Sequence, residues 1–303
     1  LGVQLVNADN GGYSNDLLLT AYLADVNSKA DAGAVYLIRG IDALSGVRDL
    51  NAVTGNFDVL WSGGTASDSL GSTSNSGLGV QLVNADNGGY SNDLLLTAIS
   101  ADVNGKSDNG AVYLIRDINS LSGAKDLNEF TNNYTVLWSG GTASDFIGLT
   151  SNNGLGVQLV NVDNGGYSND LLLTAISADV NSKSNNGAVY LVKGIDGLSG
   201  VKDLNIVTNN FDVLWSGGTA SDQLGSTNNS GLGVQLVNVD NGAYANDLLL
   251  TAYLVDVNSK LNNGAVYLIK GIDGLSGVKD LNAVTNNFDV LWSGGTASDQ
   301  LGS

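Results

Sequence analysis

The sequence lacks Cys, His, Met and Pro altogether, and its 30 acidic residues are 29 Asp and the single Glu129. Without Cys there is no disulfide framework, no thiol nucleophile and no soft-metal site. Without His, the commonest general base and zinc ligand is missing. These absences exclude most familiar types of active site.

Positive charge is also scarce, because 12 Lys and Arg stand against the 30 acidic residues and leave a net charge of −18. A nucleic acid or an anionic membrane surface would meet almost no counter-charge, so neither is expected as a partner. No apolar run approaches the roughly 20 residues of a membrane helix, so we expect a soluble chain without membrane insertion. With 43% hydrophobic and 14% charged residues, the chain should form a packed core.

The dominant feature of the chain is a repeat with a period of 77 residues. The string Leu-Gly-Val-Gln-Leu-Val-Asn begins at Leu1, Leu78, Leu155 and Leu232. It divides a single repeat domain, 1–303, into the units 1–77, 78–154, 155–231 and 232–303. A chain that begins with Leu rather than Met is expected to be a processed product or a piece of something longer.

The hydrophobic pattern within a repeat predicts four strands, which in the first copy are residues 2–7, 16–24, 34–39 and 57–62. The connections are rich in Gly, Asn and Ser, and the link 40–56 is expected to hold a single helical turn. This pattern predicts an all-β, β-propeller-type repeat array of four four-stranded antiparallel blades. The main rival is an open β array. No copy has the sequence of a cap, which is compatible with a closed ring, a partial ring, end-to-end self-association or a segment of a longer array.

Two stretches of each repeat resemble the FG-GAP repeat of integrin-α-type β-propellers. In the first copy they are Leu1 to Ala21, which contains Asn-Ala-Asp-Asn-Gly-Gly-Tyr-Ser-Asn-Asp, and Gly33 to Ile38, which reads Gly-Ala-Val-Tyr-Leu-Ile. The family's Phe-Gly is Leu-Gly here, its Gly-Ala-Pro is Thr-Ala followed by Tyr or Ile, and the calcium loop is interpreted as one residue longer. The resemblance covers most of every copy and implies one blade per repeat.

The resemblance also implies a calcium site in the loop between the first two strands. Its first and third ligands fall on Asn7 and Asp9, its carbonyl ligand on Tyr13 and its closing carboxylate on Asp16, while the fifth position is Gly11 and offers no side chain. The implied ligands in the other copies are Asn84, Asp86, Tyr90 and Asp93; Asn161, Asp163, Tyr167 and Asp170; and Asn238, Asp240, Tyr244 and Asp247.

The chemistry of this loop allows two interpretations. Ca²⁺ takes six to eight oxygen ligands, and two carboxylates with one Asn would suit the millimolar calcium of an extracellular setting. Alternatively, Asn7, Asp9 and Asn10 form an Asx-turn hairpin without metal. A second acidic loop, Asp25 to Asp31, is better interpreted as an ordinary hairpin turn.

Each copy has one Trp at the end of its last predicted strand: Trp61, Trp138, Trp215 and Trp292. Packing between blades is the favoured role, since it buries a large apolar side chain while the indole N–H finds a carbonyl. The alternative is an aromatic platform that stacks on sugars.

Every candidate group occurs four times in similar surroundings, which suits multivalent binding or assembly better than a single catalytic centre. We therefore expect a non-enzymatic, calcium-dependent, extracellular or cell-surface protein with a structural or adhesive role. It would self-associate, as a homo-oligomer or as the building block of a surface filament or sheath, with a protein or a glycan as further ligand. The alternative function is a multivalent lectin-like glycan-binding module. A third is a polysaccharide-cleaving enzyme that uses paired Asp carboxylates or calcium-bound water.

Overall fold

The computed structural model describes residues 2–51, 55–72, 79–128, 130, 133–149, 156–205, 210–227, 233–282 and 287–303. The first residue of each repeat, Leu1, Leu78, Leu155 and Leu232, therefore lies outside the described residues. The helices of the described part are short 3-10 turns: η1 (Ile41–Ala43), η2 (Ile118–Ser120), η3 (Ile195–Gly197) and η4 (Ile272–Gly274). They confirm the helical turn expected in the link, and none of them could span a membrane.

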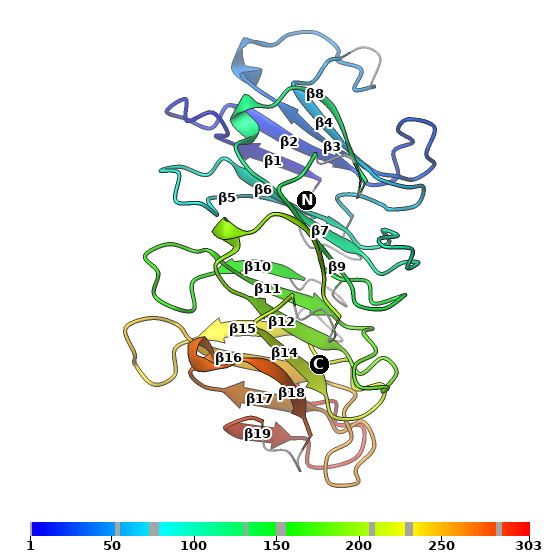
Figure 1. The fold of residues 1–303 in the computed structure, drawn as a ribbon, viewed down its shortest axis with the longest axis vertical. Helices are drawn as coiled ribbons and strands as arrows, with labels where there is room; N and C mark the ends of the chain where they lie inside the picture. The colour runs from blue at the N-terminus through cyan, green and yellow to red at the C-terminus, as the bar shows by residue number, and fades with distance from the viewer. Residues whose placement is uncertain are drawn as a thin grey trace. The chain divides into compact units, whose positions relative to one another are not determined.

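The four strands expected in each repeat are confirmed (Figure 1). The first repeat contains β1 (Val3–Val6), β2 (Asp16–Ala21), β3 (Ala34–Ile38) and β4 (Val59–Gly63). The second contains β5 (Val80–Val83), β6 (Asp93–Ala98), β7 (Ala111–Ile115) and β9 (Val136–Ser139). The third contains β10 (Val157–Val160), β11 (Asp170–Ala175), β12 (Ala188–Val192) and β14 (Val213–Gly217), and the fourth β15 (Val234–Val237), β16 (Asp247–Ala252), β17 (Ala265–Ile269) and β19 (Val290–Ser293).

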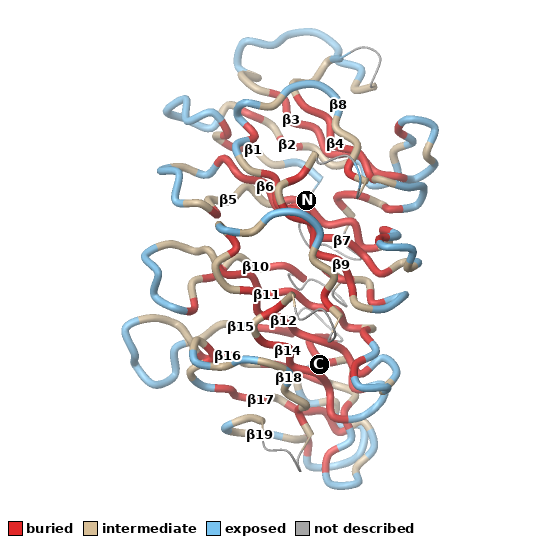
Figure 2. The backbone as a smooth tube through the Cα atoms, viewed as in Figure 1, coloured by how far each residue is buried: buried red, intermediate tan, exposed pale blue. Residues whose placement is uncertain are grey.

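These strands pair in chain order as antiparallel meanders. In the first repeat Val3 lies opposite Leu19, Leu17 opposite Ile38, and Val35 opposite Trp61. Side chains alternate between the two faces of a strand, and all five residues of β3 are buried (Figure 2). Hydrophobic residues therefore cover both faces of the central strands.

In the described part of the chain, three of the four sheets contain a fifth strand, which corrects the expectation of four-stranded antiparallel blades. The extra strands are β8 (Gly123–Leu127), β13 (Gly200–Asp203) and β18 (Gly277–Leu281), and each comes from the link of the following repeat. β8 runs parallel to β4, with Val59 opposite Gly123 and Gly63 opposite Leu127. The sequence pattern predicts the pairing inside a repeat, whereas this strand forms because the last strand of the preceding repeat has an open edge of backbone donors and acceptors.

The chain forms two compact units, one made of Leu1–Thr73, Leu78–Ser139 and Leu198–Lys202, the other of Ser74–Gly77, Gly140–Gly197 and Asp203–Ser303.

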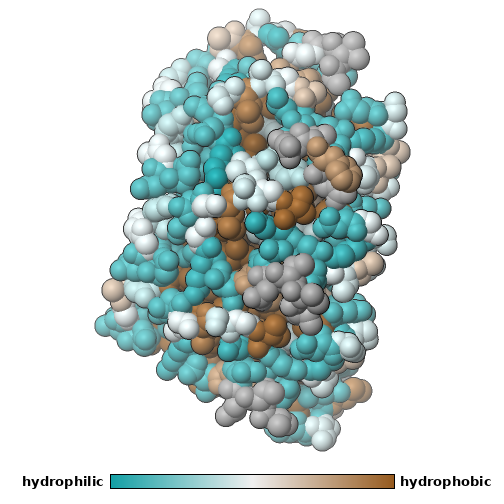
Figure 3. Space-filling model, in the orientation of Figure 1, coloured by the Kyte–Doolittle hydropathy of each residue, from teal (hydrophilic) through white to brown (hydrophobic). Residues whose placement is uncertain are grey.

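Hydrophilic residues dominate the face shown in Figure 3, and hydrophobic ones show only in small patches. Among the described residues, the fourth sheet ends at β19, and no strand joins it to the first sheet. The structure is thus an all-β repeat array.

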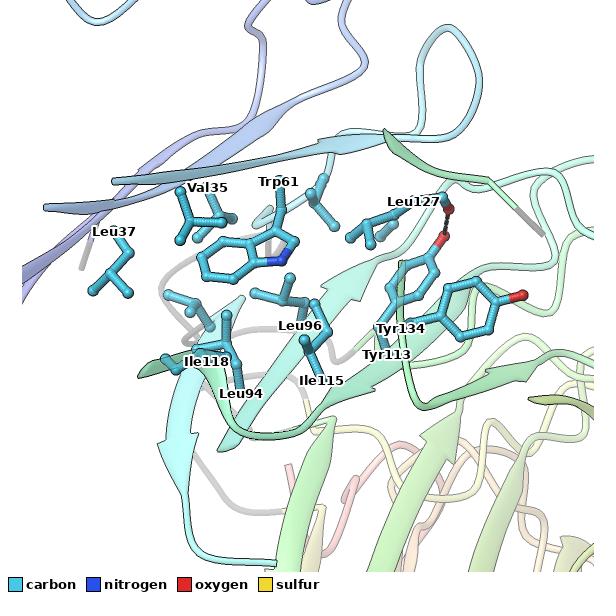
Figure 4. Close-up of a cluster of buried hydrophobic side chains, with 14 of the residues drawn as sticks. Val35, Leu37, Trp61, Leu94, Leu96, Tyr113, Ile115, Ile118, Leu127 and Tyr134 are labelled. Carbon is cyan, nitrogen blue, oxygen red and sulfur yellow. Dashed lines mark hydrogen bonds between the residues drawn. The ribbon is translucent and has the colours of Figure 1, made fainter. Parts of the chain in front are cut away.

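In the first unit, the sheets of repeats one and two pack face to face. Trp61 of β4 lies among Leu94 and Leu96 of β6 and Ile118 of η2 (Figure 4). Val35 and Leu37, Leu82, Tyr113, Ile115 and Leu127 belong to the same cluster or pack against it. The second unit repeats this core around Trp215, Leu248, Leu250 and Ile272. Burial of each large side chain contributes about 1.5–3 kcal/mol, so the inter-repeat face is a main source of stability.

Candidate functional site

The loop between the first two strands of each repeat is folded by its own Asx side chains. The Gly11 N–H is 3.0 Å from Asn7 Oδ1 and 2.9 Å from Asp9 Oδ1, and donates to both. The same two hydrogen bonds recur at Gly88, Gly165 and Gly242. The Asx-turn geometry predicted as one interpretation is therefore present in all four copies.

Asp16 has a different position from the other implied ligands. It is fully buried at the start of β2, where its Oδ2 accepts from the Ala8 N–H at 2.8 Å and its Oδ1 from the Gly40 N–H at 3.0 Å. The structure gives Asp93, Asp170 and Asp247 the same pair of backbone donors. These carboxylates therefore tie the loop to the segment after β3, and their oxygens are directed at backbone amides.

Burial of these aspartates has an electrostatic cost. Burial raises the pKa of Asp93 and of Asp170, and the two backbone N–H groups that each carboxylate accepts act in the opposite direction. The charged form of each buried carboxylate is thus stabilised by two backbone N–H groups, one just after the first strand of the repeat and one just after the third.

A third element closes the loop from the side of the 3-10 turn. Tyr13 donates its hydroxyl hydrogen to Asp42 Oδ2 at 2.8 Å, and Asn15 donates to Asp42 Oδ1 at 3.1 Å. The hydrogen bond from Tyr13, followed by that from Asn15, holds the pKa of Asp42 below its ordinary value. Asp42 is thus a carboxylate at neutral pH that fixes both loop residues.

In the second repeat, different residues form hydrogen bonds with the side chains of the loop tyrosine and asparagine. Asn119 stands at the place of Asp42 and donates to the Tyr90 hydroxyl at 2.7 Å. The carboxylate that accepts from Asn92 is Asp117 instead, two positions earlier, at 3.0 Å. Asp117 adopts a left-handed φ of 53°, where the other copies have Gly. The retained contact indicates that the orientation of the Asn92 side chain matters to the loop.

At Gly88 and Gly242, oxygen atoms of different residues surround the space beside the loop glycine, which has no side chain to fill it. A Cβ on Gly88 would lie 2.9 Å from Asp86 Oδ1 and 3.6 Å from Asn92 Oδ1. At Gly242 the neighbours are Asp240 Oδ1 at 3.0 Å, and Asn238 Oδ1 and the Tyr244 carbonyl oxygen, both at 3.8 Å. Carboxylate, amide and carbonyl oxygens are the donors that Ca²⁺ prefers. The residues present therefore fit a hard cation.

One candidate oxygen ligand is absent from the set predicted from the sequence: the asparagine two residues after the loop tyrosine, which is Asn15 in the first repeat and Asn92 in the second. Asn92 is only 4% exposed and its Oδ1 accepts no hydrogen bond, although its amide nitrogen is engaged. Asn15 Oδ1 and Asn169 Oδ1 are buried acceptors without a partner in the same way. The interpretation of the loop as one residue longer places the closing ligand on Asp16; without that insertion, the alternating positions 7, 9, 11, 13 and 15 place it on Asn15.

The second acidic loop is the hairpin turn that the sequence predicted. The Lys29 N–H donates to the Val26 carbonyl at 3.0 Å, and Asp25 Oδ1 accepts from the Asp31 N–H at 2.9 Å. The ammonium group of Lys29 turns away from this loop to Asp126 of the next repeat, at 2.5 Å. This loop therefore contributes to the contact between repeats.

Packing between repeats, the favoured role of the tryptophans, is confirmed for Trp61 and Trp215, which belong to the hydrophobic clusters shared by neighbouring repeats. Trp61, Trp138 and Trp215 are 0% exposed, so their indole rings are not available to stack on a sugar. The N–H groups of these three rings have no hydrogen-bond partner, so the expected bond to a carbonyl is not formed. Trp292, in contrast, is 47% exposed.

Close packing between repeats also explains the second glycine of the Trp-Ser-Gly-Gly sequence in the first three repeats. A Cβ on Gly64 would lie 2.6 Å from Asn128 Cα of the next repeat. Gly141 and Gly218 meet Asn205 and Asn282 in the same way. The glycines are needed because the backbone of the next repeat passes directly over them.

Models of known protein families give no match to this chain, and no curated protein matches it in sequence.

Proposed function

We propose that this chain is a non-enzymatic structural or adhesive repeat protein that acts outside the cell. Its repeats would be FG-GAP-like, propeller-type blades that extend as an array and form part of a surface filament or sheath. The observation that carries this proposal is the recurrent junction, in which the link of one repeat adds a parallel strand to the sheet before it. A junction that any copy can form with the next suits a protein built by repetition.

Calcium is the second part of the proposal. Asn7, Asp9, the Tyr13 carbonyl and Asn15 would hold one ion per repeat, with the equivalent residues in the other copies. Bound calcium would supply a positive charge that links these oxygens and stiffens the loop between the first two strands. One carboxylate among such donors is a small ligand charge, which fits the weak binding of extracellular modules, at about 10⁻⁴–10⁻³ M. The chain's own residues hold the loop closed by the contacts of Asp16 and Asp42.

The test compares two quadruple variants of the whole chain. In the first, Asp9, Asp86, Asp163 and Asp240 become Asn, which keeps an acceptor for the glycine N–H and removes one charge per loop. In the control, Asp25, Asp102, Asp179 and Asp256 become Asn in the hairpin turn. Calcium at millimolar concentration should raise the melting temperature of the wild type and the control, and a chelator should reverse it.

The first variant should lose this response. An equal calcium response in both variants, or none in the wild type, would contradict a calcium site in these loops. Electron microscopy of the same samples tests the structural role: ordered filaments that loosen on chelation support it, and uniform single particles at every concentration contradict it.

A further inference from the structure

The positive charges of the chain occupy three fixed positions of the repeat. In repeat two these positions are Lys106, Arg116 and Lys125, and every other repeat has a Lys or Arg at the same three places. Together they account for all 12 basic residues of a chain whose net charge is −18. Positive charge is therefore confined to a few places, where it can dominate the local potential.

The first of these positions serves the contact between repeats. Lys29 pairs with Asp126 of the following repeat at 2.5 Å, and Lys183 pairs with Asp280 in the second unit. Asp126 is the neighbour of Lys125 in β8, and successive side chains of a strand point to opposite faces. Lys125 thus lies on the face of β8 that is turned away from the ion pair of Lys29 and Asp126.

The second and third positions line one cavity. In repeat two it has a volume of about 270 Å³, and its walls include Ile115, Arg116, Leu121, Lys125, Tyr134 and Thr135. In repeat four the same positions line a cavity of about 320 Å³, among them Lys270, Lys279 and Asp289. This recurrence indicates that the cavity belongs to the architecture of the repeat.

An aspartate beside the second basic position is present in three of the four repeats. Asp58 accepts a hydrogen bond from the Arg39 N–H at 2.7 Å, and its Oδ1 is 3.8 Å from Nη1 of the Arg39 guanidinium group. The equivalent hydrogen bonds run from the N–H of Lys193 to Asp212 and from the N–H of Lys270 to Asp289, both at 2.7 Å. These carboxylates place one negative charge at this side of the cavity.

Repeat two has Thr135 at the place of this aspartate. Its Oγ1 accepts a hydrogen bond from the Arg116 N–H at 3.1 Å, so the contact to the backbone is kept while the negative charge is lost. Of the described residues that line the cavity, two are basic and none is acidic. The carboxylates that are closest in sequence are engaged elsewhere, since Asp117 accepts from Asn92 and Asp126 pairs with Lys29.

The two basic side chains differ in their other contacts. Where its partners are described, the second position reaches the following repeat: Arg39 Nη2 donates to the Ile118 carbonyl at 2.6 Å and to the Leu121 carbonyl at 3.2 Å. Such carbonyl groups satisfy the donors but carry no negative charge to compensate the guanidinium group. Lys125 is half-buried and takes part in none of the ion pairs between described residues. The cavity of repeat two therefore combines uncompensated positive charge with apolar walls.

We propose that the cavity of repeat two binds the carboxylate group of a small organic acid, such as an acidic sugar. The ligand would supply the negative charge that Asp58, Asp212 and Asp289 supply in the other repeats. Lys125 would pair with the carboxylate, because ion-assisted hydrogen bonds are the strong ones, and the apolar walls would pack against the remainder of the ligand. The volume is below the about 300–1,000 Å³ of pockets for drug-sized ligands, so it suits one sugar unit or a smaller acid. The inference goes beyond the proposed function, which requires no such ligand.

The experiment is an NMR titration of the isotope-labelled full chain at neutral pH and low salt, in calcium-free buffer. D-galacturonate should shift the amide signals of Arg116, Lys125 and Thr135 in a saturable way and leave those of Lys270 and Asp289 unchanged. Neutral D-galactose should shift none of them. Acetate is the third probe: the same shifts from acetate show that any carboxylate binds, and shifts from D-galacturonate alone show that the sugar ring contributes.

Exchanges between repeats provide variants that the fold already accommodates. Thr135→Asp gives repeat two the residue of the other three and should weaken binding at least about tenfold, because its carboxylate competes with that of the ligand. Asp289→Thr makes the opposite change in repeat four and should add a second site there, with saturable shifts at Lys270. The melting temperatures of both variants should match that of the wild type.

Two lysine variants separate the local charge from the net charge. Lys125→Gln removes a positive charge that lines the cavity and should also weaken binding at least about tenfold. Lys260→Gln is the matched control, since it removes the same charge from a residue that donates to the Gly295 carbonyl and does not line either cavity. It should bind like the wild type.

Four results would overturn the inference: a wild type without saturable shifts, equal binding of D-galactose and D-galacturonate, binding that Thr135→Asp or Lys125→Gln does not weaken, or no new site in Asp289→Thr. The calcium and filament tests are separate from all four, because the titration contains no calcium and reports on repeat two. A chain that binds D-galacturonate but shows neither a calcium response nor filaments keeps the carboxylate site and loses the proposed function.

Discussion

Residues 210–226 and 287–303 have the same sequence but lie in different surroundings. Both contain the last strand of a repeat, and both strands pair with the preceding strand in the same register, with Val189 opposite Trp215 and Val266 opposite Trp292. Nevertheless Trp215 is 0% exposed and Trp292 is 47% exposed. Figure 2 shows the same contrast in the strands that carry them, since β14 is buried and β19 is mostly intermediate. The third repeat is covered by the fourth, through β18 and the core around Leu248 and Leu250. The neighbouring repeat therefore determines whether this segment is buried, because the sequence of the segment itself is the same in both places.

The same comparison extends to ionisation. Burial raises the pKa of Asp222, although it accepts hydrogen bonds from Thr219. The pKa of Asp299 is lowered, chiefly by the hydrogen bond from the Thr296 hydroxyl, because this carboxylate is exposed. Both aspartates make the same contact to a threonine, with a hydroxyl-to-carboxylate distance of 2.6 Å. Desolvation by the following repeat therefore decides the direction of the shift.

The largest expected difference between the two segments concerns the tryptophans. Trp215→Ala should lower the free energy of unfolding by about 3–5 kcal/mol, because it opens a cavity in the core between repeats three and four. Trp292→Ala should cost less than about 1 kcal/mol in the monomer, since surface substitutions have small effects. Urea unfolding of both variants at low concentration measures the difference. Equal losses would show that the fourth sheet is covered in solution.

A smaller difference is expected at the glycines that follow these strands. Gly218→Val should destabilise the chain by about 1–3 kcal/mol, because the new side chain would overlap the backbone and Cβ of Asn282. Gly295→Val should change the stability of the monomer by less than about 0.5 kcal/mol. Thermal unfolding of both variants provides the measurement. An unchanged melting temperature of Gly218→Val would show that the backbone of Asn282 does not lie against Gly218.

The smallest effect is the pH dependence of the two aspartates. Because the folded-state pKa of Asp222 is raised, its contribution to stability is fully present below the ordinary value of 3.8 and is lost as the pH rises through the raised pKa. Asp299 has the opposite sign: its contribution is present above 3.8 and is lost as the pH falls through the lowered pKa.

Unfolding free energies between pH 7 and pH 3 test this difference. Relative to Asp222→Asn, the wild type should gain stability as the pH falls, whereas relative to Asp299→Asn it should lose stability at the acidic end. Two variants with the same pH profile would show that the following repeat does not desolvate Asp222.

Much of the repeat could be predicted from the sequence because its determinants are local. The short, continuous apolar runs of segments such as Ala34–Ile38 determine the strands, and Gly, Asn and Ser determine the turns between them. The 77-residue period places these elements in every copy. The Asx turn at Asn7 and Asp9 also follows from neighbouring residues.

Other features could not be predicted because they depend on residues far apart in the chain. The link segment Gly123–Leu127 has few hydrophobic residues of its own, and it becomes a strand only because the edge of β4 is free beside it. The contact that holds the Asn15 side chain could not be predicted either, because Asp42, which accepts its amide hydrogen, lies in the turn after β3. The sequence also left open whether the repeats form a closed ring, a partial ring or an open array, because that arrangement depends on contacts between distant residues.

The sequence by itself determined the period, the four strands, the turns and the oxygen-rich loop, because each depends on residue types at short range. The tertiary structure alone decided that the repeats are joined by a parallel strand, and that three tryptophans are buried and one is not. These outcomes depend on which surface lies against which, and identical sequences such as 210–226 and 287–303 contain no information about that.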